Sequence, residues 1–418
     1  MAQGAGVRAA HHETIGLNMR QLRESWPVVA ILAGSLVFQR FGLPLGQATV
    51  PAVLPIVVIV FVIAGLQGRV TFSRRGLSGY VLLFLGALLS TAFAVAVPAD
   101  QTTVSYSSLL YLVLIYAVLA FRLSPALGVV RTVTVFRNFV VLLALAGCLQ
   151  FGAQLVGWQL FSFANIVPER FLIEKDYNVV IPLWRGAHIF KSNGFFLLEP
   201  SMLSQIVAVG LAIEFLYFGK LWRMALLALA FLAAFSGTGI LVFGFAVVAA
   251  LVLDRKSSAR CAKLLVIAGA VTVLFAAVAP QYIEVFTTRA SDMHSEQTSA
   301  HMRFISPYKI VADLADDPRS LLGFGPGTAE RFRSTSYVYG VNAFTKIWIE
   351  YGPLGLLFFL LLLASTLYRA DMKVLSAVGL FWFAFGGGYL LMPAVVYTLA
   401  ALLAWGPGLS PSRLLEYG

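Results

Sequence analysis

The segment Lys191–Gln205, "KSNGFFLLEPSMLSQ", places an acid at the start of a run that is apolar enough to cross a membrane. Proline is tolerated in the first turn of a helix, so Pro200 predicts a helix that begins near Glu199 and ends at about Phe218. About 19 residues at roughly 1.5 Å each span about 28 Å, enough to cross the hydrocarbon. Glu199 then either caps this helix or acts as a partly desolvated general base that lines a cavity.

Basic residues gather in two polar segments, 161–196 and 281–346. We expect most of them to be solvated or paired with neighbouring acids. Arg303 differs, because "AHMRFISPY" surrounds it with apolar residues, and its planar guanidinium suits phosphate oxygens. Lys191 either extends its ammonium to the membrane interface or contacts a phosphate. The full set is Arg185, Lys191, Arg303, Lys309, Arg319, Arg331 and Arg333.

A glycine-rich stretch, Gly323–Gly327, could offer backbone amides to a phosphate, although a turn without a ligand is favoured. The sequence has no P-loop, no Asp-x-Asp, no Gly-x-Ser-x-Gly and no His/Cys metal spacing. We therefore expect no metal and no cofactor, so that the charge of a phosphate leaving group would be met by arginine and lysine. His188, His294 and His301 could carry a proton, although an ordinary loop role is favoured for each.

The composition of the chain indicates that these residues belong to a membrane protein. Of 418 residues, 59% are apolar and only 12% are charged, with a mean hydropathy of +0.85. A soluble protein of this length could not bury so much apolar surface, so we predict an all-α polytopic membrane protein. Apolar runs of about 20 residues predict about twelve spans. They are 27–43, 49–66, 77–97, 104–121, 138–160, 197–218, 221–235, 237–253, 262–280, 347–367, 374–391 and 393–407.

The net charge of +11 is mainly a topology signal, so we expect no nucleic-acid partner. Arginines and lysines follow every second span, whereas the alternate short connections carry almost none, Arg40 excepted. By the positive-inside rule both termini are cytoplasmic. The predicted organisation is a cytoplasmic tail at 1–25, one membrane domain at 26–407 and a cytoplasmic tail at 408–418. Segments 161–196 and 281–346 are periplasmic, and the second forms a large loop between spans 9 and 10.

Two further expectations concern the N-terminus and the cysteines. The first 25 residues are polar, so no cleavable signal peptide is expected and the first apolar run is an anchor. Cys148 and Cys261 are not expected to form a disulfide.

The large loop contains a predicted amphipathic helix, "SPYKIVADLADDP". Ser306 is its expected N-cap, with Pro307 in the first turn and Asp317-Pro318 ending it. Its apolar face is expected to comprise Tyr308, Val311, Ala312 and Ala315. Such a loop is too apolar for a free tail, so we expect it to lie over the helices as a lid.

The order "KSNGFFLLEPSMLSQ", "FSGTGILVF", "HMRFISPYKI…DDPRSLLGFGPGT" and "VNAFTKIWIEYGPLGLLFFL" resembles the O-antigen ligase and Wzy-type O-antigen and exopolysaccharide polymerase superfamily. The resemblance covers about residues 185–365. It implies a polytopic fold with a long periplasmic loop between late spans. It also implies a metal-independent, inverting transfer of a glycan from undecaprenyl diphosphate to an acceptor sugar.

The resemblance also implies roles for particular residues. Lys191 stands where the family often has an arginine before "SNG", and Arg303 matches the arginine that opens the large-loop helix. Ligases usually show His-Asn before the last external helix, but this chain has Val341-Asn342, which favours the polymerases. The implied catalytic residues are Glu199 and Arg303, and the implied substrate-binding residues are Lys191, Arg185, Asn193, Arg303, Tyr308, Arg319 and Asn342.

We therefore predict a glycosyltransferase of the bacterial inner membrane that polymerises lipid-linked repeat units at the periplasmic face. Its expected partners are an undecaprenyl-diphosphate-linked donor and acceptor, the bilayer and a chain-length regulator. One alternative is a ligase that transfers glycan to a lipid A-core acceptor. Another is a lipid-linked oligosaccharide flippase that uses Glu199, Glu214 and Glu350 for ion coupling.

Overall fold

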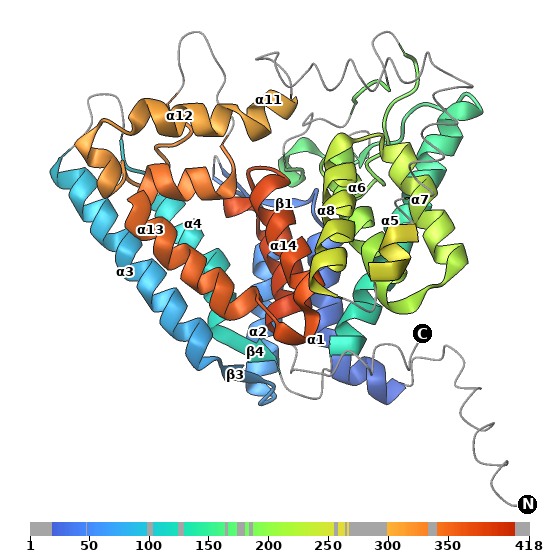
Figure 1. Cartoon of the computed structure of the whole chain (residues 1–418), viewed down its shortest axis with the longest axis horizontal. Coiled ribbons are helices and arrows are strands. Elements are labelled where there is room, and N and C mark those ends of the chain that lie inside the picture. The colour runs from blue at the N-terminus through green and yellow to red at the C-terminus, as the bar shows by residue number, and fades with distance from the viewer. Residues whose placement is uncertain are drawn as a thin grey trace, which may run out of the picture.

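The computed structural model describes most of the chain in atomic detail. The described residues are 19–46, 48–97, 103–123, 129–163, 166–173, 180–183, 187–254, 258–263, 266, 299–332 and 341–405. Helices form a bundle, with α11 (Ser299–Phe304) and α12 (Ser306–Leu314) crossing one end, which we call the lid end (Figure 1). The strands β3 (Val70–Phe72) and β4 (Phe121–Leu123) lie at the opposite end (Figure 1).

Within the described part, four helices are long and apolar enough to cross a membrane. They are α3 (Arg74–Ala96), α5 (Val129–Leu155), α6 with its continuation (Pro200–Phe218) and α13 (Ala343–Leu367). The remaining α-helices are α1 (Met19–Leu36), α2 (Val53–Leu66), α4 (Tyr106–Ala117), α7 (Leu221–Ala234), α8 (Gly237–Leu253), α14 (Lys373–Phe385) and α15 (Pro393–Leu399). Short 3₁₀ or π segments are η2 (Val118–Ala120), η4 (Glu169–Phe171), η5 (Glu214–Phe218), η7 (Pro318–Leu321), η8 (Ala370–Met372), η9 (Tyr389–Leu391) and η10 (Ala400–Ala404).

The mostly helical class is confirmed, and each predicted span other than 262–280 overlaps one of the helices named above, while the described residues within 262–280 are helical as well. Nearly all of 262–280 lies outside the described residues. Since four helices meet the length and polarity expected of a span, the count of twelve stays a prediction, as do the domain boundaries and the extent of the large loop.

Four short strands are an addition to the predicted all-α fold. β1 (Gly42–Leu45) and β2 (Ala48–Pro51) form an antiparallel pair directly after α1. β3 pairs antiparallel with β4, which joins the connection after α2 to the connection after α4. Pairing satisfies the backbone polar groups of these extended connections.

The α6 helix is the most enclosed of the long helices, with 78% of its apolar window buried. It packs against α5, α7, α8 and α14, and Figure 1 shows the first three around it. Burial on all sides agrees with its continuous apolar sequence. A polar residue at the start of α6 is therefore held inside protein.

Glycines bring α3 and α13 together. A side chain at Gly79 would lie 3.1 Å from Cα of Leu362, and one at Gly86 would lie 2.7 Å from the ring of Phe358. Removal of Cβ lets helices approach closely, as small residues do in membrane bundles. Both contacts lie in the part of α13 that follows Gly352, so they hold this part of the helix against α3.

Candidate functional site

The loop before α6 is built around Gln150 of α5. Its Oε1 accepts hydrogen bonds from Ser192 Oγ at 2.7 Å, Asn193 N at 3.0 Å and Gly194 N at 3.1 Å. Gly194 has a φ of 66°, which glycine adopts without strain. Gln150 is 2% exposed. A glutamine within an apolar helix indicates a buried polar contact, so its position in the sequence is a usable signal for this loop.

Asn193 closes the same loop onto its own end. Its Nδ2 donates to the carbonyl of Leu197 at 2.8 Å, and its Oδ1 accepts from Gln150 Nε2 at 2.9 Å. One residue further on, Leu198 N donates to Gln39 Oε1 at 3.0 Å. The side chain of Asn193 thus shapes the approach to Glu199, and a substrate contact by Asn193 stays a prediction.

Glu199 and Arg303, both predicted from sequence, form an ion pair. Nη2 of Arg303 lies 3.2 Å from Oε1 of Glu199, and their side chains are 19% and 9% exposed. Ser201 Oγ donates to Glu199 Oε1 and accepts from Arg303 Nη2 at 3.4 Å. Residues of α6 and α11 therefore bring an acid, a cation and a hydroxyl together at the lid end.

Glu199 occupies the N-cap position of α6, and Pro200 lies in the first turn, as predicted. Its side chain nevertheless makes no cap hydrogen bond to the helix. The capping alternative is therefore wrong, because the carboxylate points to Arg303 and Ser201 instead.

The carbonyl of Gly386, directly after α14, binds the second terminal nitrogen of Arg303. Gly386 O accepts from Arg303 Nη1 at 3.2 Å and from Gln205 Nε2 at 3.0 Å. Gln205 Oε1 in turn accepts from Trp382 Nε1 at 2.7 Å and from Tyr389 OH at 2.5 Å. Sequence reasoning missed this network, although a glutamine six residues after Glu199 in an apolar helix is a usable signal.

The lid differs from its prediction in two details. Its helix α12 starts at Ser306, which is the first helical residue, and Ile305 is the N-cap. The buried residues are Ser306, Pro307 and Ile310, whereas Tyr308 is 50% exposed.

The predicted apolar face of α12 was therefore wrong for Tyr308, Ala312 and Ala315, which are exposed, whereas Val311 packs against buried residues as expected. Ile310 packs into a cluster with Phe324, Ala329 and Ile349, and this larger side chain decides which face turns inward. Tyr308 consequently lies on the outward side, and a substrate contact by Tyr308 stays a prediction.

The glycine-rich stretch fits a break in α13. Gly352 has a φ of 69° inside this helix, and Pro353 has no N–H, so the carbonyls of Ile349 and Glu350 lose their usual helical donors. Phe324 N donates to Ile349 O and Gly325 N to Glu350 O, each at 2.9 Å. These two amides satisfy the helix, which agrees with a turn and leaves neither of them for a phosphate.

The two glycine segments allow no side chains at their contact. A Cβ on Gly352 would lie 2.5 Å from Leu321 O, and a Cβ on Gly323 would lie 2.5 Å from Glu350 O. Ser90 of α3 adds a hydrogen bond to Glu350 O at 3.0 Å. The motifs "GFGPG" and "EYGPLG" are thus two halves of one joint that fixes the lid on the bundle.

Other charged groups of the lid end are ion-paired. Lys346 Nζ lies 2.6 Å from Glu330 Oε1 and 3.5 Å from Glu350 Oε1. Arg319 Nη2 lies 2.6 Å from Asp317 Oδ2, and this hydrogen bond lowers the pKa of Asp317. A substrate contact by Arg319 stays a prediction.

Three more predicted binding residues have different surroundings. Lys191 Nζ lies 5.9 Å from the centre of the Phe235 ring at the end of α7. Asn342 caps α13, because its Oδ1 accepts from Phe344 N at 3.0 Å and from Thr345 N at 2.9 Å. Arg185 lies outside the described residues. Ligand binding by each of the three stays a prediction.

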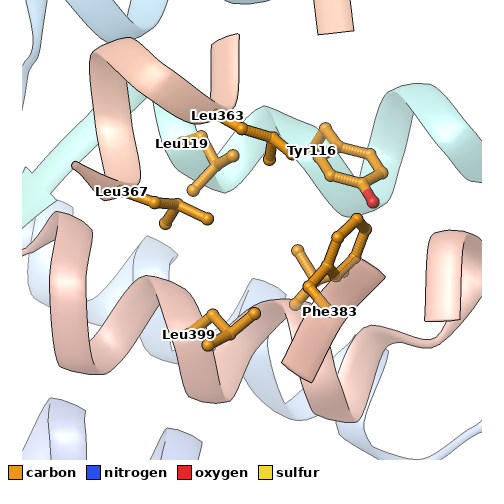
Figure 2. Close-up of a pocket in the computed structure, with 7 residues that line it drawn as sticks. Tyr116, Leu119, Leu363, Leu367, Phe383 and Leu399 are labelled. Atoms are coloured by element: carbon orange, nitrogen blue, oxygen red, sulfur yellow. The ribbon is translucent and has the colours of Figure 1, made fainter. Parts of the chain in front are cut away.

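A cavity lies away from this cluster, between α4, η2, α13, α14 and α15 (Figure 2). Its volume of about 10 Å³ is near that of one water molecule, too small for a sugar. Apolar side chains line it, and Tyr116 OH is directed to the carbonyl of Leu390. Among the described residues, no three His, Cys, Asp or Glu side chains gather as metal ligands.

Comparison with known families agrees with the predicted resemblance. Residues 222–360 match the family model Wzy_C, described as O-antigen ligase. This region contains α7, α8, Arg303 on α11, the lid and most of α13, whereas Glu199 precedes it. A search of curated proteins gives no significant match. The family implies an enzyme of O-antigen ligase or related polymerase type that acts on lipid-linked glycans in a membrane. Residues 222–360 are therefore similar to the O-antigen ligase family, which is consistent with the O-antigen ligase and Wzy-type superfamily.

Proposed function

We propose that the protein is a membrane glycosyltransferase that polymerises oligosaccharide repeat units carried on undecaprenyl diphosphate. The observation that supports this best is the Glu199–Arg303 ion pair at the lid end, where an acid–base group and a phosphate-binding group lie together. The site faces the periplasm of a bacterial inner membrane, and both termini are cytoplasmic. A chain-length regulator is a further partner.

Arg303 binds the diphosphate of the donor lipid. Its guanidinium is held by Gly386 O and Glu199, so its orientation is set before the substrate arrives. A fixed cation costs little reorganisation when negative charge develops on the leaving diphosphate, and such electrostatic stabilisation is usually the largest catalytic contribution. A diphosphate that takes over Nη2 of Arg303 displaces it from Glu199.

Glu199 then accepts the proton of the acceptor hydroxyl. The hydroxyl oxygen attacks the anomeric carbon, the bond from that carbon to the diphosphate oxygen breaks, and undecaprenyl diphosphate leaves with the electron pair. Attack from the face opposite the leaving group inverts the anomeric centre. Ser201, within reach of both Glu199 and Arg303, positions the hydroxyl or passes its proton. The lid excludes water, which would otherwise hydrolyse the donor.

A ligase is the second candidate, because the matched family is described as O-antigen ligase. Against it, position 341 is a valine where the ligases have histidine, and Asn342 serves as a helix cap. A flippase is less well supported, because its three coupling acids are all paired with cations. Glu199 binds Arg303, Glu350 lies near Lys346, and Glu214 accepts from Arg137 at 2.7 and 2.9 Å.

The test is a reconstitution of the full chain in liposomes with its lipid-linked repeat units and no ion gradient. We expect longer lipid-linked chains together with released undecaprenyl diphosphate. Transfer only to added lipid A-core would establish a ligase instead. Gradient-dependent movement across the bilayer with no new glycosidic bond would refute both enzymatic functions.

A further inference from the structure

Arg40 is a buried cation that the proposed reaction does not use. The residue is 1% exposed, and no described residue accepts a hydrogen bond from its Nε or Nη2. Removing a guanidinium from water costs several kcal/mol unless an anion compensates it. Arginine stays charged in proteins. A buried charge with two unpaired donors therefore requires an anionic partner.

The two unpaired donors form one edge of the guanidinium. Elsewhere in this protein, the same edge of Arg137 binds both oxygens of Glu214, with Nε at 2.7 Å and Nη2 at 2.9 Å. Arg40 presents the equivalent pair of parallel N–H groups. Such an edge matches two oxygens of a phosphate or carboxylate in a bidentate contact.

The backbone places Arg40 beside the candidate site. Arg40 O accepts from Ile173 N at 2.9 Å, and the adjacent Gln39 accepts from Leu198 N at 3.0 Å. Leu198 directly precedes Glu199, and consecutive Cα atoms are about 3.8 Å apart. β1, which begins two residues after Arg40, lies in the same half of the molecule as α11 (Figure 1). Gln39, the chain neighbour of Arg40, thus contacts the residue before Glu199, while Arg303 reaches Glu199 from α11.

Two lipid diphosphates must be present together if one repeat unit is added to another. Both are strongly anionic, and like charges at short range repel unless separate cations compensate each one. Glu199 already has Arg303 as its cationic partner, so charge compensation of Glu199 does not explain the presence of Arg40.

We propose that Arg40 binds the diphosphate of the acceptor lipid, while Arg303 binds that of the donor. This inference rests on the proposed polymerase function. A ligase with a lipid A-core acceptor has no need for a second undecaprenyl diphosphate site. Arg40 would recognise phosphate oxygens. A phospholipid headgroup also carries a phosphate and is therefore the competing ligand.

The experiment measures binding of undecaprenyl diphosphate to the full chain in nanodiscs by native mass spectrometry. We expect the wild type to hold a second molecule, and Arg40→Gln to lose that second molecule only. Losing a charge-assisted hydrogen bond corresponds to about tenfold to a hundredfold weaker binding. Arg303→Gln should lose the other molecule. If Arg40→Gln does not fold, Arg40→Lys replaces it in the experiment, because lysine keeps the charge. Arg40→Lys should weaken binding of the second molecule without abolishing it.

Three outcomes overturn the inference. The first is unchanged stoichiometry and affinity in both Arg40 variants. The second is a loss of bound phosphatidylglycerol, supplied as a competing lipid, in place of undecaprenyl diphosphate. The third is a wild type that binds a single molecule.

Failure of the proposed function is a separate result. A repeat unit carried on a non-cleavable diphosphate analogue can accept but cannot donate, so it isolates the acceptor site. Elongation by the wild type with an unchanged acceptor KM in Arg40→Gln would remove the inference and leave the polymerase. A second bound lipid in a chain that never elongates would keep the binding site and remove the polymerase.

Discussion

Oε1 of Glu199 lies 3.2 Å from Nη2 of Arg303, so an acid at the start of α6 and a cation on α11 are paired although they are 104 positions apart in the chain. Both side chains are largely enclosed, which strengthens their electrostatic interaction. Removing one partner of such a pair leaves the other charge uncompensated.

Glu199→Gln and Arg303→Gln should each reduce elongation by about a hundredfold or more, because each removes a group that we propose to be catalytic. Glycan length and released undecaprenyl diphosphate, measured in liposomes, give the rate. Lys309→Gln is the matched control, since it removes an exposed cation from the neighbouring helix α12. Normal elongation in both site variants, with normal insertion, would exclude this site.

The double variant Glu199→Gln/Arg303→Gln separates stability from catalysis. Each single variant leaves a largely enclosed charge without its partner, whereas the double variant leaves none. The double variant should therefore unfold at a higher temperature than either single variant and still be inactive. Thermal unfolding in detergent measures the first effect. A double variant destabilised by the sum of the two single effects would show that the pair is not coupled.

Gln205→Leu should slow elongation about tenfold, because Gly386 O would lose one of the two donors that fix it for Arg303. It also leaves Trp382 Nε1 and Tyr389 OH unpaired, at about 1–3 kcal/mol for each buried group. Tyr389→Phe removes one hydrogen bond without leaving an unpaired group on the tyrosine, so its effect should be smaller. Equal rates for the wild type and Gln205→Leu would refute this positioning role.

Gly352→Ala and Gly323→Ala should destabilise the protein, because both glycines have positive φ and both contacts are too close for a Cβ. We expect losses of about 1–3 kcal/mol or more, read as lower unfolding temperatures. Gly244→Ala in α8 is the control, since nothing lies within 4 Å of an added Cβ there. An unfolding temperature that falls equally in all three variants would show that the joint has no special role.

Gln150→Leu should detach the loop before α6, because three donors share its Oε1. Exposure of residues 192–199 to hydrogen exchange should rise, and elongation should fall with it. Leu149→Ala is the control, because Leu149 is 67% exposed on the neighbouring turn. Unchanged exchange in the loop would mean that other contacts hold it.

Local rules account for what could be predicted from the sequence. Continuous apolar runs predicted the helices, and Pro200 predicted the start of α6 at its observed residue. Glu199 and Arg303 stood out because a charge among apolar residues is costly and needs a reason. The turn at "GFGPG" could be predicted for a different reason, because glycine marks positions of special backbone geometry.

The apolar face of α12 was not readable, because Ile310 faces a cluster formed by residues distant in sequence. By itself, the sequence predicted a helical membrane protein, the start of α6 and two charged residues, Glu199 and Arg303, that stand among apolar neighbours, since these depend on local composition and spacing. Only the tertiary structure decided that Glu199 pairs with Arg303, that Gln205 and Gly386 hold the arginine, and that Arg40 is buried. Those contacts join segments far apart in the chain, and packing of the whole bundle sets their distances.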